Sequence, residues 1–249
     1  MSLFEHLLTM IILKKRTLGL IASQKWFFAK VAALDCFKIT VYKQLDIKAK
    51  SSWLFINKKS YTLHTDLCLT NDEIIKKFSS TIRNEINRSE REDCVFRSCE
   101  SKENFISVYN DFASQRGIAG LTMEKLNAIN HNLIITSCTI NGIIASVHSY
   151  LIDPDSKRVR LLHSGTQRFL DGIDRNMIAR SNKFLHFKDM IKFKEEGFEI
   201  YDWGGIAYNT EDKGLQGINK FKESFGGEMI EEKEILSPLY FLILKIFKS

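Results

Sequence analysis

The chain has 249 residues and is 44% hydrophobic, which suits one large or two small domains with a proper core and excludes a disordered chain. Its net charge of +6 favours an anionic partner such as a nucleotide, a CoA, a tRNA or an anionic lipid surface, although a solvated lysine-rich surface explains the same charge. The five cysteines are odd in number and lack metal-ligand spacing, which argues against a disulfide scaffold and a structural zinc.

The first 50 residues are too apolar for a tail and are interpreted as an addition to the domain that follows. Their apolar run from Leu7 to Leu13 is too short to cross a bilayer and lacks the cleavage site of a signal peptide. We therefore expect a cytoplasmic protein with reduced thiols and no metal site.

A strand and two helices are predicted next. The strand covers 52–69, and Thr70 and Glu73 then form a capping box for a helix near 71–91. A second helix, near 103–115, has one apolar face and ends at a glycine. A further short helix follows it.

Strands dominate the following segment. The β-rich runs 132–140 and 143–152 are joined by Asn141-Gly142, the strongest two-residue hairpin pattern. A third strand covers 159–164, and His148 lies on the middle strand, where we interpret it as structural. These runs predict a three-stranded antiparallel meander.

A crossover helix follows the meander. A helical pattern near 175–196, capped by Asp174, leads into an apolar strand at 198–203. A helix that links two strands implies that the strands are parallel with a right-handed crossover. The strands at 159–164 and 198–203 are therefore predicted to be parallel neighbours.

The most informative residues come last. Tyr201-Asp-Trp-Gly-Gly-Ile206 is an apolar strand that ends in paired glycines, which let backbone approach a ligand. The segment Gly217–Glu228 reads as a short helix with Ile218, Phe221 and Phe225 on one apolar face, stopped by two glycines. Its lysines would lie beside the strand end.

These two segments resemble the Fem family of peptidoglycan-bridge aminoacyltransferases and their acyltransferase relatives, a branch of the GNAT superfamily. The family pattern is Asp-x-Gly-Gly, then Gly-Ile-x-x-Phe-Lys-x-x-Phe-Gly-Gly-Glu. Ser80–Glu90 resembles a second family segment, in which Arg83 agrees, whereas Glu85 and Asn87 replace an asparagine and an arginine. The resemblance covers about residues 60–235.

The resemblance implies an α/β (α+β) GNAT fold: a mixed, mostly antiparallel sheet with a splayed parallel strand pair and flanking helices. Residues 51–249 would form this domain, and residues 1–50 an addition or a degenerate first half, since Fem enzymes carry two such domains. The acyl donor would lie in the cleft between the splayed strands.

His163 and Asp202 are the titratable groups expected to flank that cleft, and either could take a proton from an attacking ammonium. A hydrogen-bonded core histidine is the alternative for His163. For Asp202 the alternative is a carboxylate that ties the glycine turn to the next helix. Arg83 would bind an anionic part of the donor or acceptor, unless it only pairs with Asn87 or Glu90 on its own helix.

The Fem motif implies roles for the residues of the second segment. Lys222 would steady the oxyanion that forms when an amine attacks an ester, and Phe221 would stack on the donor. Trp203, Gly204 and Gly205 would border the donor. A surface lysine on an amphipathic helix is the alternative for Lys222.

Donor identity stays open. Acyl-CoA-using GNATs have a glycine-rich loop before the crossover helix, in which backbone N–H groups hold the pyrophosphate. Here Gln167 to Gly172 keep that pattern only partly, because a leucine and an aspartate interrupt it. We expect weak acyl-CoA binding and no permanently bound cofactor, with aminoacyl-tRNA or acyl carrier protein as other donors.

The sequence thus predicts an N-acyltransferase or aminoacyltransferase whose acceptor is an amino sugar or another cell-wall or surface-polysaccharide precursor. A catalytically silent GNAT-like binding module and an N-acyl amino acid synthase are the alternatives. The apolar C-terminal run 239–248, with its lysines, is either an element packed on the core or an anchor at the inner membrane face.

Overall fold

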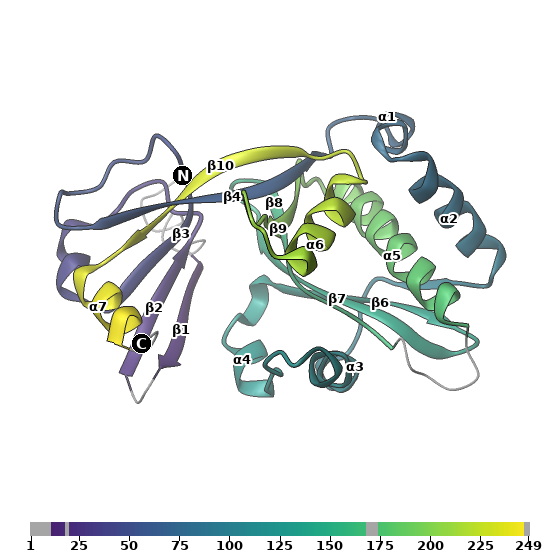
Figure 1. The fold of residues 1–249 in the computed structure, drawn as a ribbon, viewed down its shortest axis with the longest axis horizontal. Coiled ribbons are helices and arrows are strands. Elements are labelled where there is room, and N and C mark those ends of the chain that lie inside the picture. The colour runs from purple at the N-terminus through teal and green to yellow at the C-terminus, as the bar shows by residue number, and fades with distance from the viewer. Residues whose placement is uncertain (1–10, 18–19, 168–173, 247–249) are drawn as a thin grey trace. The chain divides into compact units, whose positions relative to one another are not determined.

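A computed structural model describes residues 11–17, 20–167 and 174–246, and its ribbon is drawn in Figure 1. The described part of the chain holds ten strands, seven α-helices and two short 3-10 helices. The strands are β1 Ile11–Thr17, β2 Leu20–Trp26, β3 Thr40–Asp46, β4 Ile56–Asp66, β5 Val95–Arg97, β6 Leu133–Ile140, β7 Ile143–Asp153, β8 Arg158–Thr166, β9 Ile200–Gly205 and β10 Glu228–Leu236. The helices are η1 Ala33–Phe37, α1 Asn71–Lys77, α2 Ser80–Arg91, α3 Lys102–Arg116, α4 Met123–Asn127, η2 Asn130–Asn132, α5 Arg175–Glu195, α6 Lys213–Glu223 and α7 Pro238–Ile246.

The chain divides into two compact units. Unit 1 contains residues 1–62, 205–209 and 229–249, and unit 2 contains residues 63–204 and 210–228. Because the C-terminal strand returns to unit 1, neither unit is one continuous stretch of sequence.

Unit 1 is built on the strand order β1-β2-β3-β10. β1 pairs antiparallel with β2, β2 parallel with β3, and β3 antiparallel with β10. Its core contains Cys36, Tyr42, Leu45, Phe55 and Ile235. The helix α7 packs on η1 and β3, so the predicted packed C-terminal element is present.

Unit 2 contains the strand order β9-β8-β7-β6-β5, next to the last residues of β4, from Leu63 onward. β6, β7 and β8 form the predicted antiparallel meander, and Asn141 and Gly142, both with positive φ, make its first turn. The helix α3 covers one face of the meander and α5 the other (Figure 1). Successive side chains of β7 point to opposite faces of the sheet. Val147 therefore packs with α3, whereas His148 bonds to Asp189 of α5.

The prediction of a GNAT-type fold is confirmed. The sheet is mixed, and β8 and β9 are parallel neighbours linked by the crossover helix α5, as the pattern indicated. The N-cap of α5 is Asp174, whose side chain accepts from the Asn176 N–H.

The prediction of one helix over 71–91 is wrong, because this segment forms two helices, α1 and α2. Phe78 breaks the run with an extended backbone at ψ 146°, and the Ser79 side chain caps α2. The buried Phe78 ring packs edge-on against Phe187 and Phe225. Burying this ring between two elements outweighs continuing the helix.

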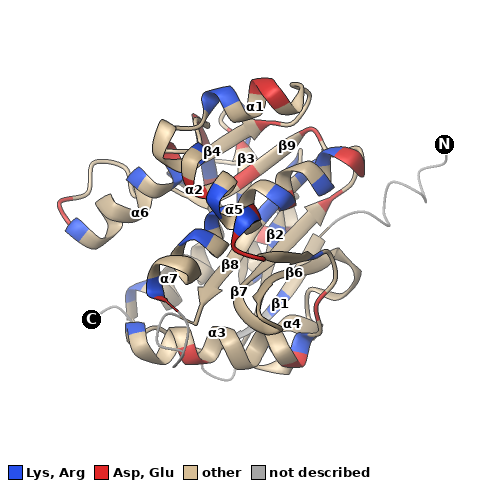
Figure 2. Cartoon of the chain, turned by 90° about the vertical axis from the view of Figure 1, so that its right-hand side faces the viewer, with Lys and Arg blue, Asp and Glu red and all other residues tan. Residues whose placement is uncertain are grey.

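Ion pairs tie α2 to α5, which is rich in Lys and Arg (Figure 2). Lys183 pairs with Glu85, and Lys188 pairs with Glu90 at 2.9 Å. Arg180 forms a two-pronged pair with Glu92, the residue at the C-terminal end of α2. The basic side of α5 is therefore largely used inside unit 2.

The predicted apolar face of α6 is only partly correct. Phe225 is fully buried, but Ile218 is 51% exposed, and the helix ends at Glu223, ahead of the glycines. The glycines are needed for close packing. A Cβ on Gly226, which has φ +71°, would collide with the Lys77 carbonyl, and one on Gly227 would come within 2.6 Å of Leu63.

Two glycines near α6 should therefore respond oppositely to alanine. We expect Gly226→Ala to destabilise the protein by about 2 kcal/mol or more, because positive φ and a backbone collision act together. Gly217→Ala, inside α6 with open space around it, should stabilise by about 0.5–1 kcal/mol. Urea unfolding curves measure both changes, and equal effects would contradict the packing described.

Candidate active site

The parallel pair β8 and β9 is joined over only a short length. The registered pairs are Arg158 with Ile200, Val159 with Tyr201, and Arg160 with Asp202. β8 nevertheless continues to Thr166 and β9 to Gly205. The pairing therefore stops in mid-strand, as in a splayed pair.

Gly204 lies two residues beyond the last registered pair. It has φ +78°, and a Cβ at this position would lie 3.1 Å from the Leu161 carbonyl oxygen. A residue with a side chain would be strained in this conformation. The first glycine of the motif is thus required by the backbone, and its contact with a donor stays a prediction.

Asp202 lies at the last paired position and is fully buried. Its Oδ2 accepts from Arg158 Nη2 at 2.5 Å and from Arg160 Nη1 at 2.9 Å, and its Oδ1 accepts from the Gly204 N–H at 2.8 Å. Two cations and a backbone donor stabilise the carboxylate. The structure thus shows Asp202 bonded to the glycine turn, as one of the two alternatives predicted, and its role as a proton acceptor stays a prediction.

The charges of Arg160 and Asp202 act on Lys222. It is half-buried on α6, and burial, followed by the positive charge of Arg160, lowers the pKa of its ammonium to about 8, against a smaller opposing effect of Asp202. Lys220, two residues earlier, is exposed. The motif lysine is therefore distinct from a surface lysine.

Aromatic rings form the wall beside Lys222. Phe221 packs against His186 at 5.6 Å and Trp203 at 6.4 Å between ring centres. Trp203 is buried and its Nε1 donates to Thr65 Oγ1 at 3.0 Å, so it supports Phe221 from within the core. Any effect of Trp203 on a donor would be transmitted through its neighbours.

A buried polar network continues from this wall into unit 2. The His186 Nδ1 and the Tyr201 hydroxyl lie 2.8 Å apart, and Tyr201 in turn bonds to the Tyr150 hydroxyl at 2.9 Å. Tyr150 donates to Asp189, which also bonds to His148. His148 is thus part of a structural network, as its place on the strand suggested.

His163 has different surroundings from Asp202. Its ring packs against Tyr109 and Phe105 of α3, and its Nδ1 lies 2.8 Å from Ser149 Oγ. Burial, and secondarily the charge of Lys125, lowers the pKa of the imidazole to about 4. This is the hydrogen-bonded core histidine that the sequence left open, and a catalytic role for it stays untested.

Arg83 binds backbone carbonyls at the junction between α1 and α2. Its Nη1 donates to the carbonyls of Phe78 and Lys76, the latter at 3.3 Å, at the C-terminal end of α1. None of the hydrogen bonds described for Arg83 goes to Asn87 or Glu90, its alternative partners on α2. All three residues line a cavity of about 350 Å³ bordered by α1, α2 and α5. Ligand binding by Arg83 stays a prediction.

The remaining predicted residues are less informative. Gly205 belongs to unit 1, where a Cβ added to it would lie 4.0 Å from the Tyr61 carbonyl oxygen, an ordinary contact distance. Gln167 donates its backbone N–H to Ala145. Gly172 lies outside the described residues. No group of three or more metal-ligating side chains that could hold a metal ion occurs within the described ranges.

Sequence reasoning missed Arg158, Arg160 and His64. The alternate arginines of β8 face Asp202 because the strands are parallel and in register, a relation that the Arg-x-Arg spacing could have suggested. Burial, and then the two arginines, lowers the pKa of His64 on β4 to about 4, although Asp202 opposes this. Its Nε2 is buried without a hydrogen-bond partner, so a neutral imidazole adjoins the charged cluster.

The fold is similar to those of several solved structures. FemX matches with a TM-score of 0.67 at 11% identity, over 93% of this chain and 86% of its own. The C-terminal domain of a protein named as a lysylphosphatidylglycerol synthetase, from Agrobacterium fabrum, matches with a TM-score of 0.62 at 12% identity, over 95% and 83% of the two chains. The chain has a FemX-like fold.

A third solved structure, L-PGS from Bacillus licheniformis, matches this FemX-like chain with a TM-score of 0.55 at 14% identity, over 84% of this chain and 71% of its own. No protein-family profile and no curated protein sequence matches the chain. No helix in the described ranges is both long enough and apolar enough to span a bilayer. The FemX-like fold is therefore established by structure, not by sequence similarity.

The Asp202 cluster should dominate the stability of the β8–β9 pair. We expect Asp202→Asn to destabilise by about 3–5 kcal/mol, because two buried guanidinium groups lose their counter-charge. Glu199→Gln is the matched control, since Glu199 pairs with Lys157 at the start of the same two strands but in solvent. Its urea midpoint should not move. Similar shifts of the urea midpoint for both variants would show that the buried Asp202 carboxylate stabilises the protein no more than an exposed ion pair does.

Proposed function

We propose that this protein transfers an acyl or aminoacyl group from an activated ester or thioester to an amino group. The observation that carries the proposal is Lys222, a half-buried cation on α6 whose pKa is lowered to about 8 by burial and then by Arg160, which lies at the end of the parallel pairing. A fixed cation in a dry cleft is suited to an oxyanion. The FemX-like fold supports the same chemistry.

The bond changes define what the site must do. The neutral amine attacks the carbonyl carbon, so a C–N bond forms and the carbonyl oxygen becomes an oxyanion, which Lys222 stabilises. The C–O or C–S bond then breaks, and the leaving oxygen or sulfur takes the proton that the nitrogen loses. Asp202 holds Arg160 in place, and Phe221 provides an apolar wall for the donor.

The donor is proposed to be an acyl-CoA, with aminoacyl-tRNA and acyl carrier protein as rivals. The partial phosphate-binding pattern from Gln167 to Gly172 supports CoA. The name of the Agrobacterium fabrum relative, which denotes synthesis of an aminoacylated lipid, supports an aminoacyl donor. Titration calorimetry with acetyl-CoA and charged tRNA decides between them: heat with charged tRNA alone would overturn the CoA proposal.

The acceptor is proposed to be an amino sugar or another precursor of the cell wall or a surface polysaccharide. This rests on the FemX-like fold and on the resemblance of the Gly217–Glu228 segment. A silent binding module, the rival from another class, is disfavoured by the half-buried position of Lys222. An N-acyl amino acid synthase would instead require a long apolar tunnel beside β8.

Removal of the Lys222 ammonium should affect turnover more than binding. We expect Lys222→Ala to lower kcat by about 10²–10³-fold with little change in KM, because the oxyanion exists only near the transition state. Lys220→Ala is the control, since that lysine is exposed on the same helix. Steady-state kinetics with the donor and acceptor found by binding tests this. Equal kcat values for both variants would remove Lys222 from the mechanism.

The pKa of Lys222 also predicts a pH profile. Because burial and Arg160 lower this pKa to about 8, the ammonium is about nine-tenths charged at pH 7 and is lost as the pH rises through 8. We expect kcat to fall above pH 8 in the wild type. Lys222→Arg should be slower, since a planar fork replaces a point charge, but should lack this falling limb.

A kcat that rises with pH would assign Lys222 a different role. If kcat rose through pH 8 and Lys222→Arg abolished that rise, the neutral amine of Lys222 would be acting as the general base.

A further inference from the structure

Unit 1 has an apolar face made by two neighbouring elements. On α7, Leu239, Leu242 and Ile246 are exposed and share one side of the helix through their i, i+3, i+7 spacing. On η1, Leu34 and Phe37 are 73% and 74% exposed. Because α7 packs on η1, these five exposed residues lie on adjacent elements and are together called the α7/η1 face.

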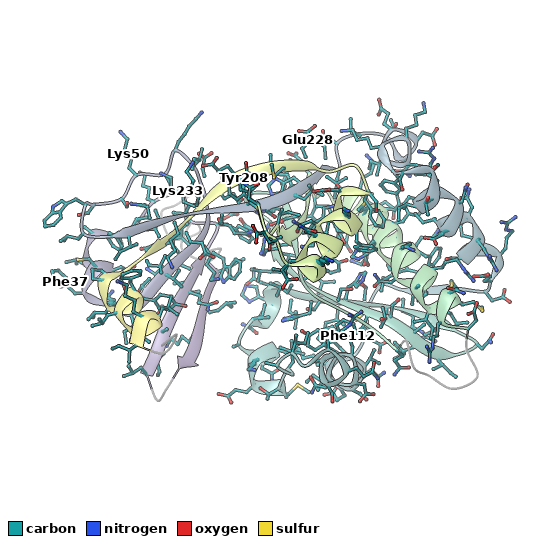
Figure 3. All side chains as sticks on the ribbon, viewed as in Figure 1. Phe37, Lys50, Phe112, Tyr208, Glu228 and Lys233 are labelled. Atoms are coloured by element: carbon teal, nitrogen blue, oxygen red, sulfur yellow. The ribbon has the colours of Figure 1, made fainter. Side chains whose placement is uncertain are left out.

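Figure 3 shows Phe37 on the outer side of unit 1 beside α7. Its exposed ring is not part of the unit 1 core, which contains Cys36 on the same short helix. It is unusual for a phenylalanine and four large aliphatic residues on adjacent helices to be exposed to water.

Charge is distributed unevenly between the units. Unit 1 holds 14 of the 36 Lys and Arg residues but only 6 of the 30 Asp and Glu residues, a net charge of +8 against −2 for unit 2. The basic character of the whole chain therefore comes from unit 1.

Lysines border the α7/η1 face itself. Lys245 is exposed on α7, and Lys38 follows η1 with its side chain 66% exposed. The single acid of η1, Asp35, is buried and forms ion pairs with both Lys38 and Lys25. These three residues together therefore carry a net positive charge. The face is thus apolar in its middle and cationic at its border.

We propose that the α7/η1 face docks unit 1 on an anionic lipid bilayer surface, with Phe37 and Leu242 entering the headgroup region. Exposed apolar side chains bordered by lysines are the combination by which a helix lies in a membrane interface. Each lysine near an anionic leaflet contributes its own attraction. A second copy of the chain fits less well, because two faces with the same positive border would repel one another.

Sedimentation with lipid vesicles tests the proposal on the purified full chain. The vesicles contain phosphatidylcholine alone or with about one third phosphatidylglycerol. We expect at least tenfold stronger binding to the anionic vesicles, and Phe37→Ser/Leu242→Ser should lower that binding at least tenfold. The double variant Val95→Ser/Ile118→Ser is the control, because these two apolar residues of unit 2 are also about half exposed, at 54% and 48%. It should bind as the wild type does.

The lysine contribution is measured separately. Lys38→Gln/Lys245→Gln should lower binding to anionic vesicles by about fivefold for each lysine, while Lys125→Gln/Lys213→Gln in unit 2 should not. Unfolding midpoints check that every variant is folded. Absence of wild-type binding, equal binding to both vesicle types, or no effect of Phe37→Ser/Leu242→Ser would overturn the proposal. So would dimerisation in solution that this variant abolishes.

Discussion

The Asp202 carboxylate, buried between Arg158 and Arg160, is the constraint on which the candidate site depends. It lies at the last residue pair of the only described parallel strands in unit 2 that a crossover helix links. A buried carboxylate with two guanidinium partners is stable only while all three groups keep their geometry. The same charges then act on Lys222, so the stability of the strand pair and the electrostatics of the site cannot be changed independently.

Local patterns were enough to predict most of unit 2. The hairpin at Asn141-Gly142, the capped helix α5 and the parallel strand pair follow from turn chemistry, capping and the right-handed crossover, which are short-range or topological rules. The break at Phe78 could not be predicted in this way. Whether an apolar residue continues a helix or leaves it depends on rings from α5 and α6 that are distant in the sequence.

The site was predictable only in part, for a related reason. The motif located Lys222, Asp202 and Gly204, but it said nothing of what neutralises Asp202. The partners, Arg158 and Arg160, become recognisable only once β8 and β9 are known to be in register. Conversely, His163 was assigned to the cleft from its position near a strand end, whereas a shift in the β7–β8 register accompanies its placement against α3.

The lowered pKa of Lys222 and the charge of unit 1 also revise how the net charge of the chain should be interpreted. Because burial and the charge of Arg160 lower its pKa to about 8, the Lys222 ammonium loses its proton more readily than an exposed lysine does. Unit 2 as a whole is slightly acidic. Unit 2 therefore lacks the net positive charge that would attract an anionic donor over a long range, and in the proposed mechanism its cations would act at contact distance on a developing charge. The positive field of the chain belongs to unit 1, so the proposed binding of an anionic surface and the proposed binding of an anionic substrate have separate physical causes.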